Sequence, residues 1–180
     1  GVRGEFNEFK VVGINLGAIK TNFSVGFNKP SIMIQSLEGK FPQTEYTGTG
    51  ELSFNEADRG MNLDVNIKNS TVNDLTKIFY KGLRPYGKEL SFVKANFRSQ
   101  FKLKGGYSLG ELEIVGHVDG RGLSFGKEDF EGFSGFYSFR DKMLDLKPLI
   151  INKHESKFVV EGRYDFFGGK NQLKIFTAHA

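Results

Sequence analysis

Apolar residues occupy every second position through most of the last 70 residues of this chain. Leu112, Ile114 and Val118 begin the pattern, and similar runs follow to the end of the chain. Polar segments expected to form tight turns separate these runs, at 119–122, 140–142, 152–155 and 168–171. Period-two alternation gives a sheet one apolar face and one polar face. What covers the apolar face is therefore the central question about this chain.

The amino-acid composition also favours strands. The 180 residues include 19 Phe and no Trp, with 23 Gly against 4 Pro. Phe is common in strands, and Gly supplies turns and bulges. A chain of this length can form one domain with a sizeable core. We treat residues 1–180 as a single unit and expect it to be a segment of a longer protein.

The charge distribution argues against a nucleic-acid partner. The formal net charge is +4, but charges of both signs are interspersed along the chain. Proteins that bind nucleic acids gather Lys and Arg into one stripe. The absence of Cys excludes disulfides and thiolate metal sites, and no stretch of the sequence approaches 18 apolar residues.

The N-terminal part of the chain shows the same alternation. Phe23, Val25 and Phe27 alternate ahead of an expected turn, and further strands are expected over 46–55 and 61–67. Strands recur roughly every 8–14 residues without helices between them, which is typical of antiparallel meanders. We therefore predict an all-β fold: an elongated, curled, mostly antiparallel sheet of about a dozen strands that forms a groove.

One segment departs from the strand pattern. Apolar residues within 70–80 fall at helical spacing, and Thr71 with Asp74 resembles a capping box, with Ser70 as an alternative cap. Gly82 follows as a stop signal. The sequence therefore predicts one short helix near 71–80.

Candidate catalytic groups are few. His117 shares strand parity with Glu113 and Asp119, so the three side chains are expected on one face of the sheet. Such a trio suits a metal or acid–base site, but a solvated polar face explains the same pattern better. His154, in an expected turn, and His179, near the end of the chain, have no evident partners.

Two other motifs also have a structural explanation. Glu111 and Glu113 alternate as a glycosidase carboxylate pair does, yet neighbouring carboxylates are common on exposed strands. The TGTG segment at 47–50 lacks the Lys of a phosphate-binding loop and is expected to mark a bulge or bend. We therefore expect no enzymatic activity, no cofactor and no metal site.

The apolar face itself is the candidate site. A second sheet would cover it in a closed β-sandwich, an interaction module that binds protein or carbohydrate through its loops. Alternatively, the sheet stays open and curls into a trough, which the abundance of Phe and the short connections favour. The residues expected to line this trough are Phe23, Val25, Phe27, Leu52, Phe54, Leu63, Val65, Ile67, Phe97, Phe101, Leu103, Leu112, Ile114, Val118, Leu123, Phe125, Phe133, Tyr137, Phe139, Leu144, Leu146, Phe158, Val160, Tyr164, Phe166, Leu173 and Ile175.

Three segments of the chain resemble the AsmA-like/TamB superfamily of bacterial envelope proteins, and the resemblance extends from about residue 44 to residue 177. Residues 110–125 (GELEIVGHVDGRGLSF) have a Gly at the start of each short strand. Residues 144–166 (LDLKPLIINKHESKFVVEGRYDF) are similar to the strand, polar turn and strand unit of the family. Residues 61–79 (MNLDVNIKNSTVNDLTKIF) resemble a strand that leads into one of the family's helical plugs.

The resemblance implies a taco-shaped groove that shields phospholipid acyl chains as they cross the periplasm. Members of the TamB type work with an outer-membrane partner of the Omp85 class, which is TamA, and assist the assembly of outer-membrane β-barrel proteins. The expected location is thus the periplasmic part of a protein anchored in the inner membrane. Burial of about 16 methylene groups would contribute on the order of 10 kcal/mol. Exposed edge strands would invite pairing with nascent barrel strands or self-association edge to edge.

Overall fold

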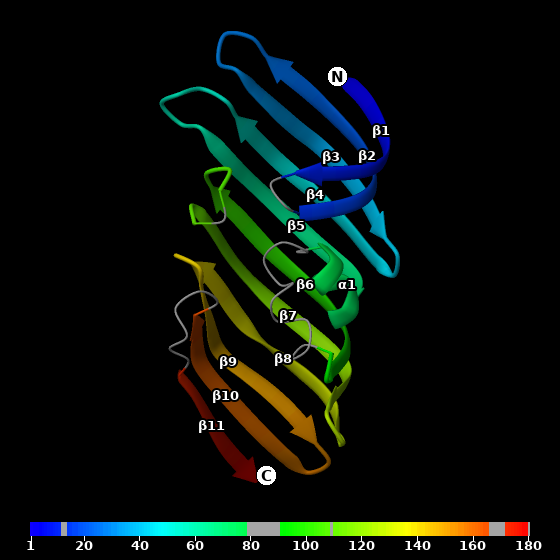
Figure 1. The fold of residues 1–180 in the computed structure, drawn as a ribbon, viewed down its shortest axis with the longest axis vertical. Coiled ribbons are helices and arrows are strands. Elements are labelled where there is room, and N and C mark those ends of the chain that lie inside the picture. Colours follow the sequence, from blue (N-terminus) through cyan, green and yellow to red (C-terminus); the bar gives the residue numbers. More distant parts are fainter. Residues whose placement is uncertain (12–13, 79–90, 109, 166–171, 180) are drawn as a thin grey trace.

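The computed structural model describes residues 1–11, 14–78, 91–108, 110–165 and 172–179, which form one large sheet and one short helix. The sheet has eleven antiparallel strands, and their order across the sheet is their order in the chain (Figure 1). The strands are β1 (Val2–Val11), β2 (Ile14–Gly26), β3 (Ser31–Phe41), β4 (Thr44–Ser53), β5 (Gly60–Thr71), β6 (Val93–Gly105), β7 (Leu112–Phe125), β8 (Glu128–Arg140), β9 (Met143–Lys153), β10 (Ser156–Asp165) and β11 (Gln172–His179). The predicted all-β, elongated fold is confirmed.

The sheet is open, with β1 and β11 as its two edges. All eleven strands belong to this one sheet, so the closed β-sandwich considered as an alternative does not form in the described part of the chain. Two-residue turns at 42–43, 126–127, 141–142 and 154–155 return the chain to the neighbouring position in the sheet, whereas the short helix lies in the longer connection between β5 and β6.

The alternation of side chains along β6 shows why the two faces of the sheet differ. Phe97 and Leu103 are buried, whereas Arg98 and Lys102 between them are exposed. Pairing in register extends this difference to the next strand, so that Leu103 lies opposite Ile114 on β7. Each strand thus presents its apolar set on the same side.

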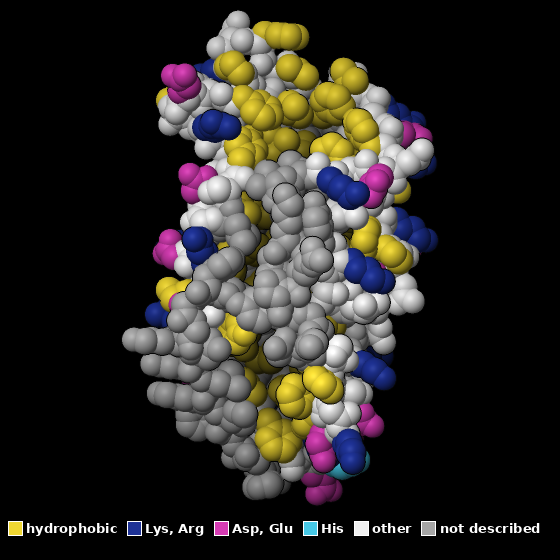
Figure 2. Space-filling view, in the orientation of Figure 1, with side chains coloured by type: hydrophobic (Ala, Val, Ile, Leu, Met, Phe, Trp, Pro, Cys, Tyr) yellow, Lys and Arg dark blue, Asp and Glu magenta, His cyan; other side chains and the backbone are white. Residues whose placement is uncertain are grey.

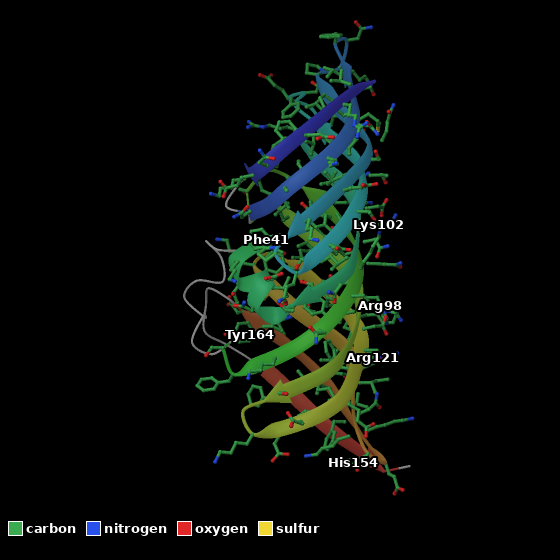
Figure 3. All side chains as sticks on the ribbon, turned by 90° about the vertical axis from the view of Figure 1, so that its right-hand side faces the viewer. Phe41, Arg98, Lys102, Arg121, His154 and Tyr164 are labelled. Carbon is green, nitrogen blue, oxygen red and sulfur yellow. The ribbon has the colours of Figure 1, made fainter. Side chains whose placement is uncertain are left out.

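The sheet curls along its length, and one face becomes concave (Figures 1 and 3). Arg98, Lys102 and Arg121 project from the convex face in Figure 3, whereas Phe41 and Tyr164 lie on the concave side with the helix. Apolar side chains gather near the upper and lower ends of this face in Figure 2. The structure therefore separates an apolar concave face from a charged convex face.

The helix α1 (Val72–Ile78) packs on the concave side against β2, β5 and β6. Its N-terminus is capped as predicted, because the backbone N–H of Asp74 donates to the Thr71 hydroxyl at 3.1 Å. The carboxylate of Asp74 does not complete a capping box and bonds elsewhere, as described below. The predicted helix near 71–80 is confirmed over the residues that the structure describes, and 79–80 and Gly82 lie outside them.

A buried apolar cluster lies in the N-terminal half of the concave face. Ile19, Tyr46 and Ile67 are its buried members. The Tyr46 hydroxyl donates to the backbone carbonyl of Leu16 at 2.7 Å. The Tyr46 ring lies over Gly39, where an added Cβ would come within 1.9 Å of the ring. A glycine at this position therefore lets the aromatic ring pack flat on the sheet.

Two features of the strands differ from the sequence-based predictions. The expected turn at 119–122 does not exist, because β7 continues through it to Phe125. Instead the register with β6 shifts between Lys94 and Asn96, and Gly122 there has a φ of 63°. The segment is thus a bulge within a long strand, which the Gly and polar residues made resemble a turn.

The structure also adds β1 and the first part of β2, which the alternation did not locate. The pairing of these two strands shifts register between Phe6 and Phe9 and again between Phe9 and Lys10. Gly17 has a φ of 68°, in the left-handed region. Each irregularity moves the apolar residues from odd to even positions or the reverse, so strict alternation does not identify these strands.

Candidate functional site

The structure brings most of the predicted lining residues together on the concave face. Cross-strand pairing arranges them in rows that cross the strands, and the rows run along the length of the groove. One row joins six successive strands from β5 to β10 and consists of Leu63, Leu103, Ile114, Phe139, Leu144 and Tyr164. Five strand spacings correspond to about 24 Å. The row of apolar side chains is thus continuous over about this distance.

The other rows contain aromatic residues above glycines. Phe133 on β8 pairs with Gly120 on β7, where an added Cβ would lie 2.1 Å from the Phe133 ring. In the same way, a Cβ on Gly116 would lie 2.8 Å from the Tyr137 ring. These glycines leave room for rings to lie low over the sheet, which deepens the groove between its sides.

Two predicted lining residues do not lie in the strands. Phe27 follows β2 in a turn and is 90% exposed, so it does not line the groove. Phe54 follows the end of β4, and its ring stacks on Tyr107 with the centroids 5.7 Å apart. Both residues continue the alternation in the sequence, which extends past the point where the strand ends. Phe166 and the side chains of Leu173 and Ile175 lie outside the described part of the chain.

The structure also identifies lining residues that the sequence analysis missed. Leu149 and Ile151 on β9 pair with Val160 and Phe158 on β10, all on the concave face. The register of β9 shifts between its pairs with Gly135 and Phe136. This shift is a bulge at Pro148, and it moves the apolar residues of β9 from even to odd positions. In the sequence, the proline within the strand is the signal of this bulge.

A cluster of polar side chains is buried beneath α1. Thr44, Ser70 and Asp74 are almost completely inaccessible to solvent. The Asp74 carboxylate accepts hydrogen bonds from the Thr44 hydroxyl at 3.0 Å and from the backbone N–H of Gln43 at 2.8 Å. The Thr44 and Ser70 hydroxyls lie 2.7 Å apart. These bonds satisfy the polar groups and fix the helix to the turn between β3 and β4.

A second polar contact lies farther along the concave face. The Ser99 hydroxyl donates to the His117 carbonyl at 2.8 Å and lies 2.9 Å from the Tyr137 hydroxyl. Burial raises the pKa of Tyr137 above its ordinary value, although the hydrogen bond to Ser99 opposes this shift. Burial also raises the pKa of Tyr46 well above its ordinary range. Both hydroxyls are therefore neutral donors, and the concave face carries no charge at either position.

The convex face carries pairs of opposite charge on neighbouring strands. Examples are Lys102 with Asp64 at 3.3 Å and Arg163 with Asp145 at 2.7 Å. The pKa of Arg163 is raised by its hydrogen bond to Asp145 and by the charge of that carboxylate. Since these pairs are exposed, they contribute solubility more than stability.

The predicted trio around His117 lies on the convex face but does not form one site. His117 Nδ1 is 3.2 Å from an oxygen of Asp119, which also lies 3.8 Å from Nε of Arg98. Glu113 instead pairs with Arg140 on β8. Within the described ranges no group of three His, Cys, Asp or Glu side chains is arranged to hold a metal ion.

The remaining candidate groups lie apart from one another, and two of them have structural partners. His154, for which the sequence suggested no partner, lies beside Glu131. The backbone N–H of His154 donates to the Glu131 carboxylate at 3.2 Å. Glu111 accepts from the Ser108 hydroxyl at 2.7 Å within a turn, apart from Glu113. The segment 47–50 lies within β4, and Gly50 has a φ of 147°, which agrees with a strand bend. His179 lies in β11, and its side chain is outside the described part of the chain.

Comparisons with known proteins identify no relative: no family model, curated protein or solved structure matches this chain. Among the residues that the structure describes, no helix has the length and apolar character needed to cross a bilayer. The site that the geometry offers is therefore the apolar concave face, taken on its own physical properties.

Proposed function

We propose that this chain is a groove segment of an AsmA-like/TamB-type envelope protein, and that its concave face conducts phospholipid acyl chains between the inner and outer membranes. One observation carries the proposal: a single open sheet presents a row of apolar side chains across six strands on its concave face, while its other face is charged. A groove of this kind shields a chain of methylene groups on one side and leaves a polar headgroup in water.

The dimensions of the groove support this proposal. The row of concave-face residues from Leu63 to Tyr164 spans about 24 Å. One leaflet of a bilayer contributes about 15 Å of hydrocarbon. A single extended acyl chain therefore fits along the row, and burial of its methylene groups would contribute on the order of 10 kcal/mol.

The neutrality of the concave face also supports acyl-chain cargo. Movement of a lipid along the groove requires that no charged group of the groove holds the lipid at one position. The polar groups of the face, such as Tyr137 and Ser99, are satisfied by one another. The carboxylate of Asp74 on this side is buried and hydrogen-bonded, and that of Glu128, which pairs with Phe125, forms an ion pair with Lys153.

A second candidate function rests on the open edges of the sheet. β1 and β11 each have one side without a neighbouring strand in the described sheet. Such an edge pairs readily with an added strand. It supports a role in outer-membrane barrel assembly, in which a nascent barrel strand or an Omp85-class partner pairs with the edge.

The test compares two phenylalanines of nearly equal exposure on opposite faces. Phe125 is 62% exposed and pairs with Val93 on the concave face, whereas Phe136 is 60% exposed and pairs with His117 on the convex face. Phe125→Glu and Phe136→Glu introduce the same charge at similar cost to folding. Native mass spectrometry of each purified variant, followed by lipid extraction, measures the phospholipid bound after incubation with vesicles of phosphatidylethanolamine and phosphatidylglycerol.

We expect Phe125→Glu to lower phospholipid occupancy and Phe136→Glu to leave it unchanged. Ile114→Glu or Phe158→Glu, deeper in the groove, should abolish binding, and circular dichroism will show whether these variants remain folded. A wild-type protein that takes up no phospholipid contradicts the proposal. Equal loss in Phe125→Glu and Phe136→Glu would show that lipid binds without regard to the concave face.

A further inference from the structure

The convex face carries a second site that the groove does not use. A depression of about 450 Å³ lies over β5, β6 and β7, and its polar side chains include Asn66, Lys68, Arg98 and Gln100. The side chains of Asn66, Lys68 and Gln100 form no hydrogen bond or ion pair with another described residue. Unused amide groups on an exposed sheet are available to a ligand.

Cross-strand pairing places three side chains of this depression, those of Asn66, Gln100 and His117, in one straight row with Phe136 beyond its edge. Asn66 pairs with Gln100, Gln100 with His117, and His117 with Phe136. The row crosses four strands, and so spans about 15 Å at the usual strand spacing. Two amides, an imidazole and a phenyl ring thus face solvent side by side.

Phe136 is an unusual residue on a charged face. Its side chain is 60% exposed, and its ring lies 4.8 Å from the His117 ring, centroid to centroid, at an angle of 60°. Val115, one pair along β7, is also half exposed. Since the concave face is available for apolar side chains, an exposed ring here contributes little to folding and offers a flat apolar surface to a ligand.

The site carries charges of both signs. The carboxylate of Asp119 lies 3.2 Å from His117 and 3.8 Å from Arg98, and so offsets the charge of Arg98, while Lys68 adds a second cation to the lining. A polyanion would therefore meet attraction from Lys68 and Arg98 but repulsion from Asp119. A neutral ligand rich in hydroxyl groups would use the same carboxylate as an acceptor and the amides as both donors and acceptors.

We propose that this row binds a linear β-1,4-linked oligosaccharide laid across β5 to β8. Such a glycan is extended and flat, and each pyranose ring advances by about one strand spacing, ~5 Å. Equatorial hydroxyls of successive rings would bond Asn66 and Gln100, and the apolar face of a ring would stack on Phe136. This inference does not rest on the proposed lipid function, because it concerns the opposite face.

The experiment titrates cellotetraose and chitotetraose into ¹⁵N-labelled protein and follows the amide signals by NMR. We expect saturable shifts centred on Asn66, Gln100, His117 and Phe136. Phe136→Ala and Gln100→Ala should each raise the dissociation constant about tenfold, while Phe136→Tyr retains binding. Lys157→Ala, an exposed convex-face change on β10, is the matched control and should leave the affinity unchanged.

Two results would overturn the proposal. One is the absence of saturable shifts with both tetrasaccharides. The other is saturable binding that Phe136→Ala and Gln100→Ala leave unchanged in variants with native spectra. Since Phe136 is exposed, its substitution should not unfold the protein. Phospholipid occupancy, measured on the same Phe136→Ala sample, should stay at the wild-type level, so that failure of this proposal and failure of the lipid proposal are distinguishable.

Discussion

The concave face is built differently in two regions of the molecule. Where α1 packs on β5 and β6, the region contains buried polar groups and tightly packed apolar side chains such as Phe97. Along β8, the same face carries Phe130, Phe133 and Phe139, which remain partly exposed. We call the first the helix-covered region and the second the β8 region. An apolar face therefore contributes more to folding where another element is packed on it than where part of it stays in water.

The two regions should therefore respond differently to loss of an aromatic ring. Phe97→Ala, in the helix-covered region, is expected to lower the free energy of unfolding by about 3–4 kcal/mol, because it leaves a cavity among packed neighbours. Phe130→Ala, in the β8 region, should cost about half as much, since part of that ring is already in water. Urea unfolding followed by circular dichroism measures both. Equal losses would contradict the distinction between the two regions.

The buried polar cluster gives a second way to test the helix-covered region. Asp74→Ala removes the acceptor for Thr44 and for the Gln43 backbone N–H, and should lower the free energy of unfolding by about 2–3 kcal/mol. Asn73→Ala, one residue earlier on the exposed side of α1, should change it by less than about 0.5 kcal/mol. The same unfolding experiment compares them. If the two variants are equally stable, the cluster does not hold α1 in place.

Alkaline pH should act through the buried tyrosines. The pKa of Tyr46 is raised by burial, so the unfolded state loses its proton near pH 10 while the folded state keeps it. Stability is therefore fully present below about pH 10 and falls as the pH rises further. Tyr46→Phe should flatten this fall between about pH 10 and pH 11, at a cost of about 1 kcal/mol at neutral pH for the lost bond to Leu16. Unfolding curves across this pH range check both effects, and an unchanged slope in the variant would show that Tyr46 is not the responsible group.

The convex face provides the smallest expected effect and so a baseline for both regions. Lys102→Ala removes the pair with Asp64, whose side chains are both more than half exposed. We expect a change in the free energy of unfolding of less than about 0.5 kcal/mol, and none in high salt. Unfolding at low and high ionic strength measures this. A loss comparable with that of Asp74→Ala would show that convex-face ion pairs carry the fold.

Much of the fold could be predicted because most strands obey one simple rule. Alternation on β6 and β7 fixed which residues share a face, and the lone helix was visible from its spacing and its Thr71 cap. The failures all involve a change of parity. The bulges near Gly122 and Pro148 and the irregular pairing of β1 with β2 are set by contacts across strands, and one strand read alone does not contain that information.

The site was only partly predictable for a related reason. The sequence indicated which side chains are apolar and which parity they share, but Phe27 and Phe54 continue the alternation past the ends of their strands. The role of Asp74 was also hidden, because its partners at Gln43 and Thr44 lie about 30 residues earlier in the chain. The convex-face row depends in the same way on register. Asn66 and Phe136 lie far apart in the sequence, and the pairing of the two strands between them places both residues in one row.

The strictly sequential order of the strands has a consequence for how such a chain assembles and changes in length. Every strand from β2 to β10 pairs only with its predecessor and its successor in the chain, so the sheet extends by one strand at a time. Contacts between neighbours in sequence close quickly, and partial sheets can act as templates for the next strand. Addition or removal of a hairpin at an edge would lengthen or shorten the sheet without altering the cross-section elsewhere. Length is then an adjustable property of this architecture, and one on which evolution can act by duplicating a single unit.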